Sequence, residues 1–277
     1  MNRVLDALRR NRWAMFSAGL LLAMTLLCIA GPWLSAWDFD TIDFDGSWSA
    51  PPSAQHWFGT DSLGRDLYVR TLCGGRISLA VGLVGTLVSL LIGVAYGAVA
   101  GYIGGRADTL MMRAVDILYA LPFLFLVILL MVLFGRHLLL VFVAIGAINW
   151  LDMARIVRGE TLALKQRDFV AAAIVAGAGP RAIITQHIVP NLLGVVVVYA
   201  TLTVPQVILM EAFLSFLGLG VQAPATSWGA LVSEGARDME VAPAALIFPA
   251  TFLAVTLLAL NLLGDALRDA LDPRRRA

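Results

Sequence analysis

The sequence predicts an all-α integral membrane protein with six transmembrane helices. Three observations lead to this fold class. The 277 residues are 60% hydrophobic and only 14% charged, whereas soluble domains carry about 25% charged residues. The mean hydropathy is +0.84. Uncharged runs long enough to cross a bilayer, which needs roughly 20 residues, recur along the chain. So much apolar surface is stable only where lipid is the solvent.

The N-terminal region predicts a surface helix followed by a first span. Residues 1–12 mix arginines with apolar side chains, a pattern typical of an amphipathic helix that lies on the membrane. Residues 13–37 are uncharged, and Pro32-Trp33 suits a helix end at the membrane interface better than the cleavage site of a signal peptide. We therefore predict an uncleaved span over 13–37.

Five further spans are expected. Four are uncharged windows, at 77–105, 117–135, 188–210 and 241–264. The run 138–151 is short, but a helix that continues to Val157 is long enough to cross. Asp152 and Arg155 are then one turn apart and can pair. The segment 38–76 lies outside the membrane, and its end, from Asp66 to Arg76, is expected to be a helix that leads into the second span.

The basic residues predict the orientation of the chain. With a cytoplasmic N-terminus, all but five of the 20 Lys and Arg residues fall in inner segments. The positive-inside rule then places both termini and the polar segment 155–191 in the cytoplasm. The five exceptions are Arg65, Arg70, Arg76, Arg136 and Arg237.

The segment 155–191 predicts a helix, a glycine-containing turn and a second short helix. The first helix, Asp168 to Ala176, consists mainly of small apolar residues and lacks the polar outer face of a helix in water. Such a surface is typical of a face that another protein covers. A linker packed on its own bundle is the equally weighted alternative.

The sequence argues against several kinds of chemistry. The P-loop pattern G-x-x-x-x-G-K-[ST] is absent, and the single lysine, Lys165, follows Leu164, so the chain is not a P-loop ATPase. Histidines and cysteines lack metal-ligand spacing. Ser215 and His187 fall at opposite membrane faces, which argues against a nucleophilic pair. We expect no enzymatic activity, cofactor, metal or nucleic-acid partner.

The segment DFVAAAIVAGAGPRAIITQHIVPN resembles the cytoplasmic signature of binding-protein-dependent ABC importer permeases. Ala171 replaces the glutamate of that signature, and Asp168, one helical turn earlier, is a candidate substitute. The positions that match are Ala172, Ala173, Gly177 and Pro190.

The resemblance covers nearly the whole chain. HWFGTDSLGRDLYVR, GYIGG, MMRAVDILYALPF, SFLGLGVQAP and NLLGDALRDALDP are similar to the C-type permeases of the peptide and nickel branch. FVAIGAINWLDMARIVRGETLALK and HIVPNLLGVVVVYA are closest to its oligopeptide C subunits. The resemblance implies an ABC importer permease fold with a cytoplasmic coupling helix, in the bacterial cytoplasmic (inner) membrane.

The resemblance also implies partners. These are a homologous second permease, two ATP-binding subunits that hold ATP and magnesium, and a periplasmic or extracellular peptide-binding protein. Oligopeptides are the expected substrate, with dipeptides or nickel as the alternative.

Candidate residues follow from these expectations. Contacts with the ATPase subunits are expected at Asp168, Ala171, Ala172, Ala173, Gly177, Arg181, His187 and Pro190. The translocation path is expected at Tyr199, Thr203, Gln206 and Glu211, with helix-to-helix hydrogen bonding as the alternative and, for Glu211, a structural pairing favoured. Docking of the binding protein is expected in the outer segments, at Asp61, Arg65, Trp228 and Glu234.

Three other classes of protein compete with this interpretation. A transporter driven by an ion gradient needs ionisable residues near mid-membrane, and the predicted spans are nearly free of them. An intramembrane hydrolase needs a catalytic pair. An assembly factor without a transport path is the class that the sequence excludes least firmly.

Overall fold

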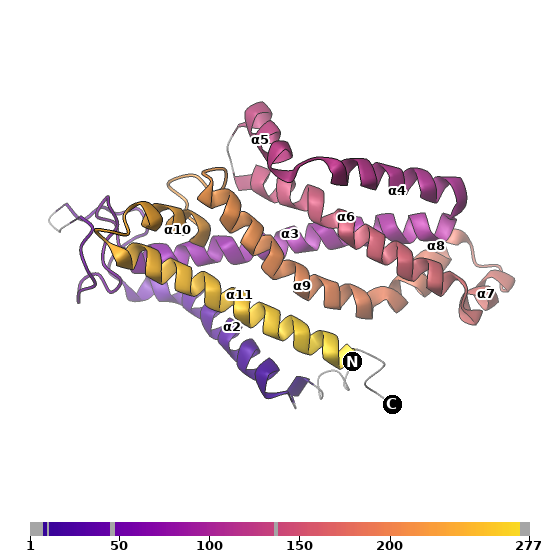
Figure 1. The fold of residues 1–277 in the computed structure, drawn as a ribbon. Helices are drawn as coiled ribbons and strands as arrows, with labels where there is room; N and C mark the ends of the chain where they lie inside the picture. The colour runs from indigo at the N-terminus through magenta and orange to yellow at the C-terminus, as the bar shows by residue number, and fades with distance from the viewer. Residues whose placement is uncertain (1–7, 10, 45–47, 136–137, 272–277) are drawn as a thin grey trace.

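The computed structural model describes residues 8–9, 11–44, 48–135 and 138–271, and the fold is helical (Figure 1). Within these ranges no β-strand forms, only two isolated bridges, Ile42 with Arg65 and Thr60 with Asp66. The long helices are α2 (Arg12–Ala30), α3 (Leu67–Ile103), α4 (Gly105–Ala120), α5 (Phe123–Phe134), α6 (Leu138–Lys165), α9 (Val189–Phe216) and α11 (Pro243–Leu271). The shorter ones are η1 (Gly31–Leu34), α7 (Asp168–Val175), α8 (Pro180–Ala182), the π-type helix η2 (Ile183–Ile188) and α10 (Trp228–Arg237).

Four helical stretches in the described part are long and apolar enough to cross a membrane. The bent pair α4–α5 adds a fifth if the two helices count as one span. The six-span count stays a prediction, and the surface helix expected at residues 1–12 lies largely outside the described residues. The four stretches are Arg12–Leu34, Leu67–Ile103, Pro180–Phe216 and Pro243–Leu271.

The prediction of one continuous helix over 117–135 is wrong. The chain breaks between α4 and α5, which meet at 83°. Pro122 lacks a backbone N–H and disfavours helical backbone at the residue before it, and Leu121 is extended with ψ 128°. The charge-free window therefore holds two helices.

Helix α3 is the centre of the fold and continues without a break from Leu67 through the bundle to Ile103. Its first turn is capped by Asp66, whose Oδ1 accepts the Val69 N–H at 2.8 Å. A row of glycines on α3 lets α6 approach closely, as small residues do between membrane helices. A Cβ added at Gly97 would lie 2.4 Å from the carbonyl oxygen of Ala154, so only glycine fits there.

The two ends of the bundle carry different elements. The start of α2, the end of α11 and helix α7 lie toward one end in Figure 1. The segments 38–44 and 48–66 and helix α10 lie at the opposite end. Helices α6 and α9 run beside α3 from one end of the bundle toward the other. A path along these two helices would therefore connect the two ends.

Candidate functional site

A polar groove of about 420 Å³ lies between α6 and α9. Three of the four side chains expected in the translocation path, Tyr199, Thr203 and Gln206, line it together. Helix α6 adds two polar side chains that the sequence did not single out for the path, Asn149 and Asp152. The remaining lining residues are Met153, Arg155, Ile156 and Leu202.

Hydrogen bonds within each helix orient part of this lining. Thr203 Oγ1 donates to the carbonyl oxygen of Tyr199 at 2.7 Å, and Asn149 Nδ2 donates to that of Ile145 at 2.9 Å. In this orientation the Asn149 amide oxygen can accept a hydrogen bond from a group in the groove. The groove can therefore bind polar groups through hydrogen bonds and one carboxylate. No group of three or more His, Cys, Asp or Glu side chains that could hold a metal occurs in the part of the chain described.

The Asp152–Arg155 pair expected from the sequence does not form. The Arg155 guanidinium instead pairs with Asp116 of α4, with Nη2 3.0 Å from Oδ1. It also lies over the ring of Tyr119, 4.4 Å from the centroid. Two interactions thus hold the arginine on α4, and Asp152 forms no ion pair within the described ranges.

Glu211 does not line the groove. Its side chain is fully buried, and its two carboxylate oxygens accept hydrogen bonds from Ser215 at 2.6 Å and from Ser78 at 3.1 Å. Ser78 in turn accepts the backbone N–H of Trp228 at 3.2 Å. Glu211 therefore joins α9 to α3 and α10. These contacts are of the structural kind that the sequence favoured for Glu211, and its place in a translocation path stays a prediction.

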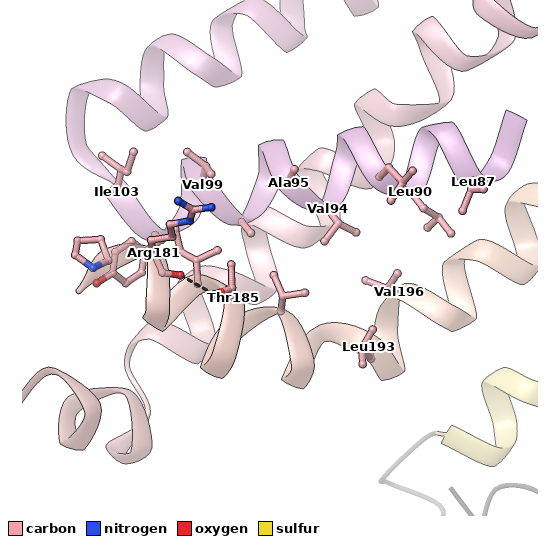
Figure 2. A pocket seen from close by; sticks show the side chains of 16 residues that line it. Leu87, Leu90, Val94, Ala95, Val99, Ile103, Arg181, Thr185, Leu193 and Val196 are labelled. Atoms are coloured by element: carbon pink, nitrogen blue, oxygen red, sulfur yellow. Dashed lines mark hydrogen bonds between the residues drawn. The ribbon is translucent and has the colours of Figure 1, made fainter. Parts of the chain in front are cut away.

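A second and larger cavity, of about 690 Å³, lies between α3 and the start of α9 (Figure 2). Arg181 sits at one end of it, beside Val99 and Ile103, whereas Leu87 and Val196 mark the other end. Nearly all of the lining is aliphatic, so it offers little to a peptide backbone that would lose its hydrogen bonds to water. We therefore place the candidate path in the smaller polar groove.

Helix α7 is a short helix with well-defined ends. Arg167 precedes it with extended backbone, and Asp168 lies in its first turn, where a negative charge is favoured. Gly177 ends it with a φ of +84°, a left-handed conformation that glycine adopts without strain. The N–H groups of Gly177 and Ala178 donate to the carbonyls of Ile174 and Ala173, each at 3.0 Å, which is a Schellman motif.

The two sides of α7 differ. Val170 is fully buried and Ala173 nearly so, and Val170 packs in a cluster with Val157 of α6 and Ile183 of η2. The opposite side is apolar and open to solvent, including the candidate residues Ala171 and Ala172. The large side chains there are Phe169, Ile174 and Val175, exposed by 38%, 53% and 89%. Helix α7 is thus anchored to its own bundle along one side and uncovered along the other.

The other candidate coupling residues continue from α7 toward α9. Arg181 is exposed in α8, and its carbonyl accepts a hydrogen bond from Thr185 at 2.9 Å. His187 is half-buried in η2, and its carbonyl accepts from Asn191 at 2.6 Å. Pro190 is exposed in the first turn of α9, where its missing N–H costs little.

At the opposite end, three of the four residues expected to dock the binding protein form one ion-pair cluster. Arg65 Nε lies 2.7 Å from Asp61 Oδ2, and Arg65 Nη2 lies 3.7 Å from Glu234 Oε2. The cluster is completed by Arg70, which is almost fully buried and contacts the same two acids, Asp61 at 3.3 Å and Glu234 at 2.9 Å. These contacts join the segment before α3 to α10.

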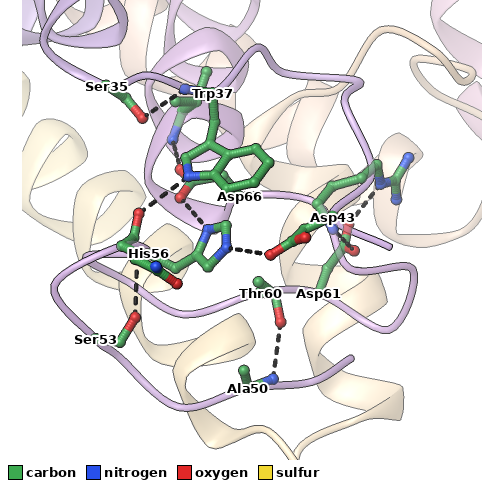
Figure 3. A network of polar contacts seen from close by, with 12 residues as sticks. Ser35, Trp37, Asp43, Ala50, Ser53, His56, Thr60, Asp61 and Asp66 are labelled. Atoms are coloured by element: carbon green, nitrogen blue, oxygen red, sulfur yellow. Dashed lines mark hydrogen bonds and ion pairs between the residues drawn. The ribbon is translucent and has the colours of Figure 1, made fainter. Parts of the chain in front are cut away.

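A histidine network fixes the same segment onto α3 (Figure 3). His56 Nδ1 lies 2.8 Å from Asp66 Oδ2, and Nε2 lies 3.3 Å from Asp43 Oδ2. The ring of Trp37 packs against that of His56, tilted by 30° with centroids 4.6 Å apart. Because Asp66 also caps α3, the network links the loop directly to the central helix.

Trp228 is not a surface residue. It is fully buried, and its indole N–H donates to the carbonyl oxygen of Thr71 at 2.9 Å. A Cβ on Gly75 would lie 2.6 Å from the Trp228 ring, so the tryptophan packs directly against the backbone of α3. The Trp228 side chain therefore holds α10 on the bundle and is not exposed to the binding protein that it was expected to dock.

Sequence reasoning missed two features that position the site. The first is the bidentate pair between Arg158 of α6 and Asp108 of α4, at 2.5 and 2.7 Å. Both helices carry several charges, so the sequence gives no signal that pairs these two residues. The second is the spacing of Gly93, Gly97 and Gly101, a small-xxx-small repeat that predicts a close helix contact.

Comparison with known proteins agrees with this architecture. Residues 93–277 match the family model described as "Binding-protein-dependent transport system inner membrane component", and residues 1–52 match "N-terminal TM domain of oligopeptide transport permease C". The structure resembles a chain of the MetNI methionine ABC transporter in inward facing conformations, with a TM-score of 0.59 over 73% of this chain and 96% of that one. At 19% identity this likeness shows the fold alone.

Curated relatives cover almost the whole chain. The "Oligopeptide transport system permease protein OppC" of Haemophilus influenzae is 54% identical over 96% of this chain and 86% of its own length. The protein of the same name in Escherichia coli is 55% identical over 98% of this chain and 91% of its own length. The resemblance seen in the sequence is thereby confirmed. The chain is a multi-pass inner-membrane protein and belongs to the family of binding-protein-dependent transport system inner membrane components.

Proposed function

We propose that this chain is the permease subunit of an ATP-driven importer that takes up oligopeptides across the bacterial cytoplasmic membrane. The observation that carries the proposal is its 54–55% identity, over nearly the whole chain, to relatives named as oligopeptide permease subunits. The polar groove between α6 and α9 supports it, because a peptide needs hydrogen-bonding groups along its path. The chain itself performs no catalysis.

The proposed topology has six spans, with both termini in the cytoplasm. The bent pair α4–α5 and helix α6 would add two spans to the four long apolar stretches. The start of α2, the end of α11 and α7 lie toward the same end of the bundle, which supports a common cytoplasmic side (Figure 1). The segment 38–76 would be periplasmic, and the permease core would cover 77–277 with its coupling segment at 155–191.

The partners in this proposal are a homologous second permease, two ATP-binding subunits that carry ATP and magnesium, and a peptide-binding protein outside. The exposed apolar side of α7 would contact an ATP-binding subunit, with Asp168 near the position of the missing family glutamate. Val170 and Ala173, on the buried side, would pass movement of α7 to η2 and α6. ATP closes the motor dimer, and only one conformation of the permease fits the closed dimer.

Peptide would enter from the outer end and pass along the groove. In the cluster of Asp61, Arg65 and Glu234 we propose Glu234, whose side chain is 45% exposed, as the contact for the binding protein, with the buried Asp61 and the 13% exposed Arg65 behind it. In the groove, Tyr199, Thr203, Gln206 and Asn149 would exchange hydrogen bonds with the peptide backbone. Such contacts are independent of side-chain identity and suit a path for varied peptides.

The test is uptake of a labelled peptide by vesicles that contain the complete transporter. We expect uptake to need ATP inside and to persist when an ionophore collapses ion gradients. Ile174→Glu, on the open side of α7, should abolish copurification with the ATP-binding subunits. Leu63→Glu is the matched control, because Leu63 is 50% exposed in the outer segment and Ile174 is 53% exposed. Uptake without any ATP-binding subunit would contradict the proposal.

A further inference from the structure

Asp152 is the only carboxylate among the side chains that line the polar groove. It is exposed, it lies near the middle of α6, and it forms no ion pair within the described ranges. A charge in a membrane-spanning helix is costly, and such residues usually face a water-filled cavity or a functional partner. Asp152 is therefore a carboxylate that faces the groove without a partner of its own.

Arg155, the basic residue one turn along α6, forms its ion pair elsewhere. Its guanidinium pairs with Asp116 at 3.0 Å and stacks on Tyr119. Both partners belong to α4, so the guanidinium is drawn away from Asp152. Arg155 also lines the groove, but its guanidinium is already paired, so among the described residues Asp152 is the charged group of the groove that forms no ion pair.

We propose that Asp152 is an anionic subsite for an alkylammonium group of the passing peptide. This inference rests on the proposed function as a peptide permease and adds a charged contact to it. An ammonium group has three N–H donors and needs acceptors for each. Asp152 supplies the charged acceptor, and the Asn149 amide oxygen, left free by its Nδ2 bond to Ile145, supplies a second. The ammonium can come from the amino terminus of the peptide or from a lysine side chain.

The experiment compares Asp152→Asn with wild type in vesicles that contain the complete transporter. Three peptides are used, each at a concentration that saturates the binding protein: trialanine, N-acetyl-trialanine, and an N-acetylated tripeptide whose central residue is lysine. Glu160→Gln is the matched control, because Glu160 is an exposed carboxylate on the same helix that does not line the groove. Asp152→Glu keeps the charge and tests for rescue. Copurification with the partner subunits and basal ATP hydrolysis report assembly.

We expect Asp152→Asn to lower uptake about tenfold for a peptide that carries the recognised ammonium, the size of one charge-assisted hydrogen bond. A loss for trialanine assigns the amino terminus, and a loss for the lysine peptide assigns the side chain. Uptake of uncharged N-acetyl-trialanine should not change. Asp152→Glu should restore most of the lost uptake, and Glu160→Gln should match wild type.

Two results would overturn the inference while leaving the proposed function in place. One is equal loss for all three peptides, which means a structural role or a pair with the second permease. The other is no loss for any peptide although wild type imports them. If wild type itself shows no ATP-dependent uptake, it is the proposed function that fails.

Discussion

The two ends of this molecule are stabilised in different ways. At the end that carries α10, which is the outer end in the proposed topology, charged side chains are buried and paired, as Arg70 is with Asp61 and Glu234. At the α7 end, large apolar side chains such as Ile174 and Val175 face outward with nothing over them. The charged side chains at the first end pair with one another, whereas the open side of α7 carries exposed apolar side chains that we propose a partner protein covers.

The difference follows from how each end is built. An isolated helix as short as α7 is unstable in water, so its stability must come from the Val170 anchor and from whatever covers its open side. Helix α10 is little longer, yet Ser227 caps it and Trp228 fixes it in the core. Substitutions at the outer end should therefore change the stability of the whole chain, and substitutions on α7 should change partner binding.

The largest effect on stability is expected for Arg70→Met. Removing the buried guanidinium leaves Asp61 and Glu234 with only Arg65, and breaking a buried ion pair costs about 3–5 kcal/mol. We expect the free energy of unfolding to fall by about 3 kcal/mol, the low end of that range, because Arg65 remains and Glu234 is partly exposed. Thermal unfolding of the purified chain in detergent measures it. Arg237→Met, at an exposed position in α10, is the control, and equal effects would show that the cluster does not stabilise the outer end.

Trp228→Phe should lower the free energy of unfolding by about 2 kcal/mol, because it removes the indole hydrogen bond to the Thr71 carbonyl and packed volume. The same unfolding measurement applies. Trp33→Phe is the control, since Trp33 is 80% exposed, and it should change the midpoint little. A loss for Trp228→Phe as small as that of its control would restore the surface role predicted from sequence.

Gly177→Ala should destabilise the C-terminal turn of α7 by about 1 kcal/mol, because alanine is strained at a φ of +84°. The global unfolding midpoint should hardly move, while affinity for the ATP-binding subunits should fall about fivefold, the equivalent of about 1 kcal/mol. Gly179→Ala is the matched control: its φ is −71° and no atom lies within 4 Å of the added Cβ. Equal affinities for the two variants would mean that the end of α7 does not shape the contact.

The smallest effect on stability is expected for Ile174→Glu. Because Ile174 is more than half exposed, the free energy of unfolding should change by no more than about 0.5 kcal/mol, as for Leu63→Glu. Binding of the ATP-binding subunits should nevertheless be lost only in the first variant. A large drop in the unfolding midpoint would show that this side of α7 packs on its own chain, which would remove the contrast between the two ends.

Composition alone predicts the helical membrane class, because it depends only on how apolar the chain is. The position of α7 and the polar side of α9 also follow from local patterns, and Tyr199, Thr203 and Gln206 do meet in one groove. The sequence could not identify the partner residue in each contact. Arg155 has acceptable partners one turn away and on another helix, and only the packing of α4 decides between them.

The same limit explains the errors. A hydropathy window counts charges and does not register that Pro122 stops a helix. Glu211 and Trp228 have polar groups that suit a path or an interface, yet each is buried because Ser78 and Thr71 on α3 supply a partner. Those pairs join residues more than 130 positions apart, which no local pattern reveals.

Cross-linking from the two ends tests the central claim most directly. Cysteine would replace Ile174 in one variant and Leu63 in another, in a chain whose Cys28 and Cys73 are replaced by alanine, and each would carry a photoactivatable label in the assembled transporter. The account predicts that the label at residue 174 joins an ATP-binding subunit and that the label at residue 63 never does. A link from residue 63 to an ATP-binding subunit, or from residue 174 to the binding protein outside, would contradict it.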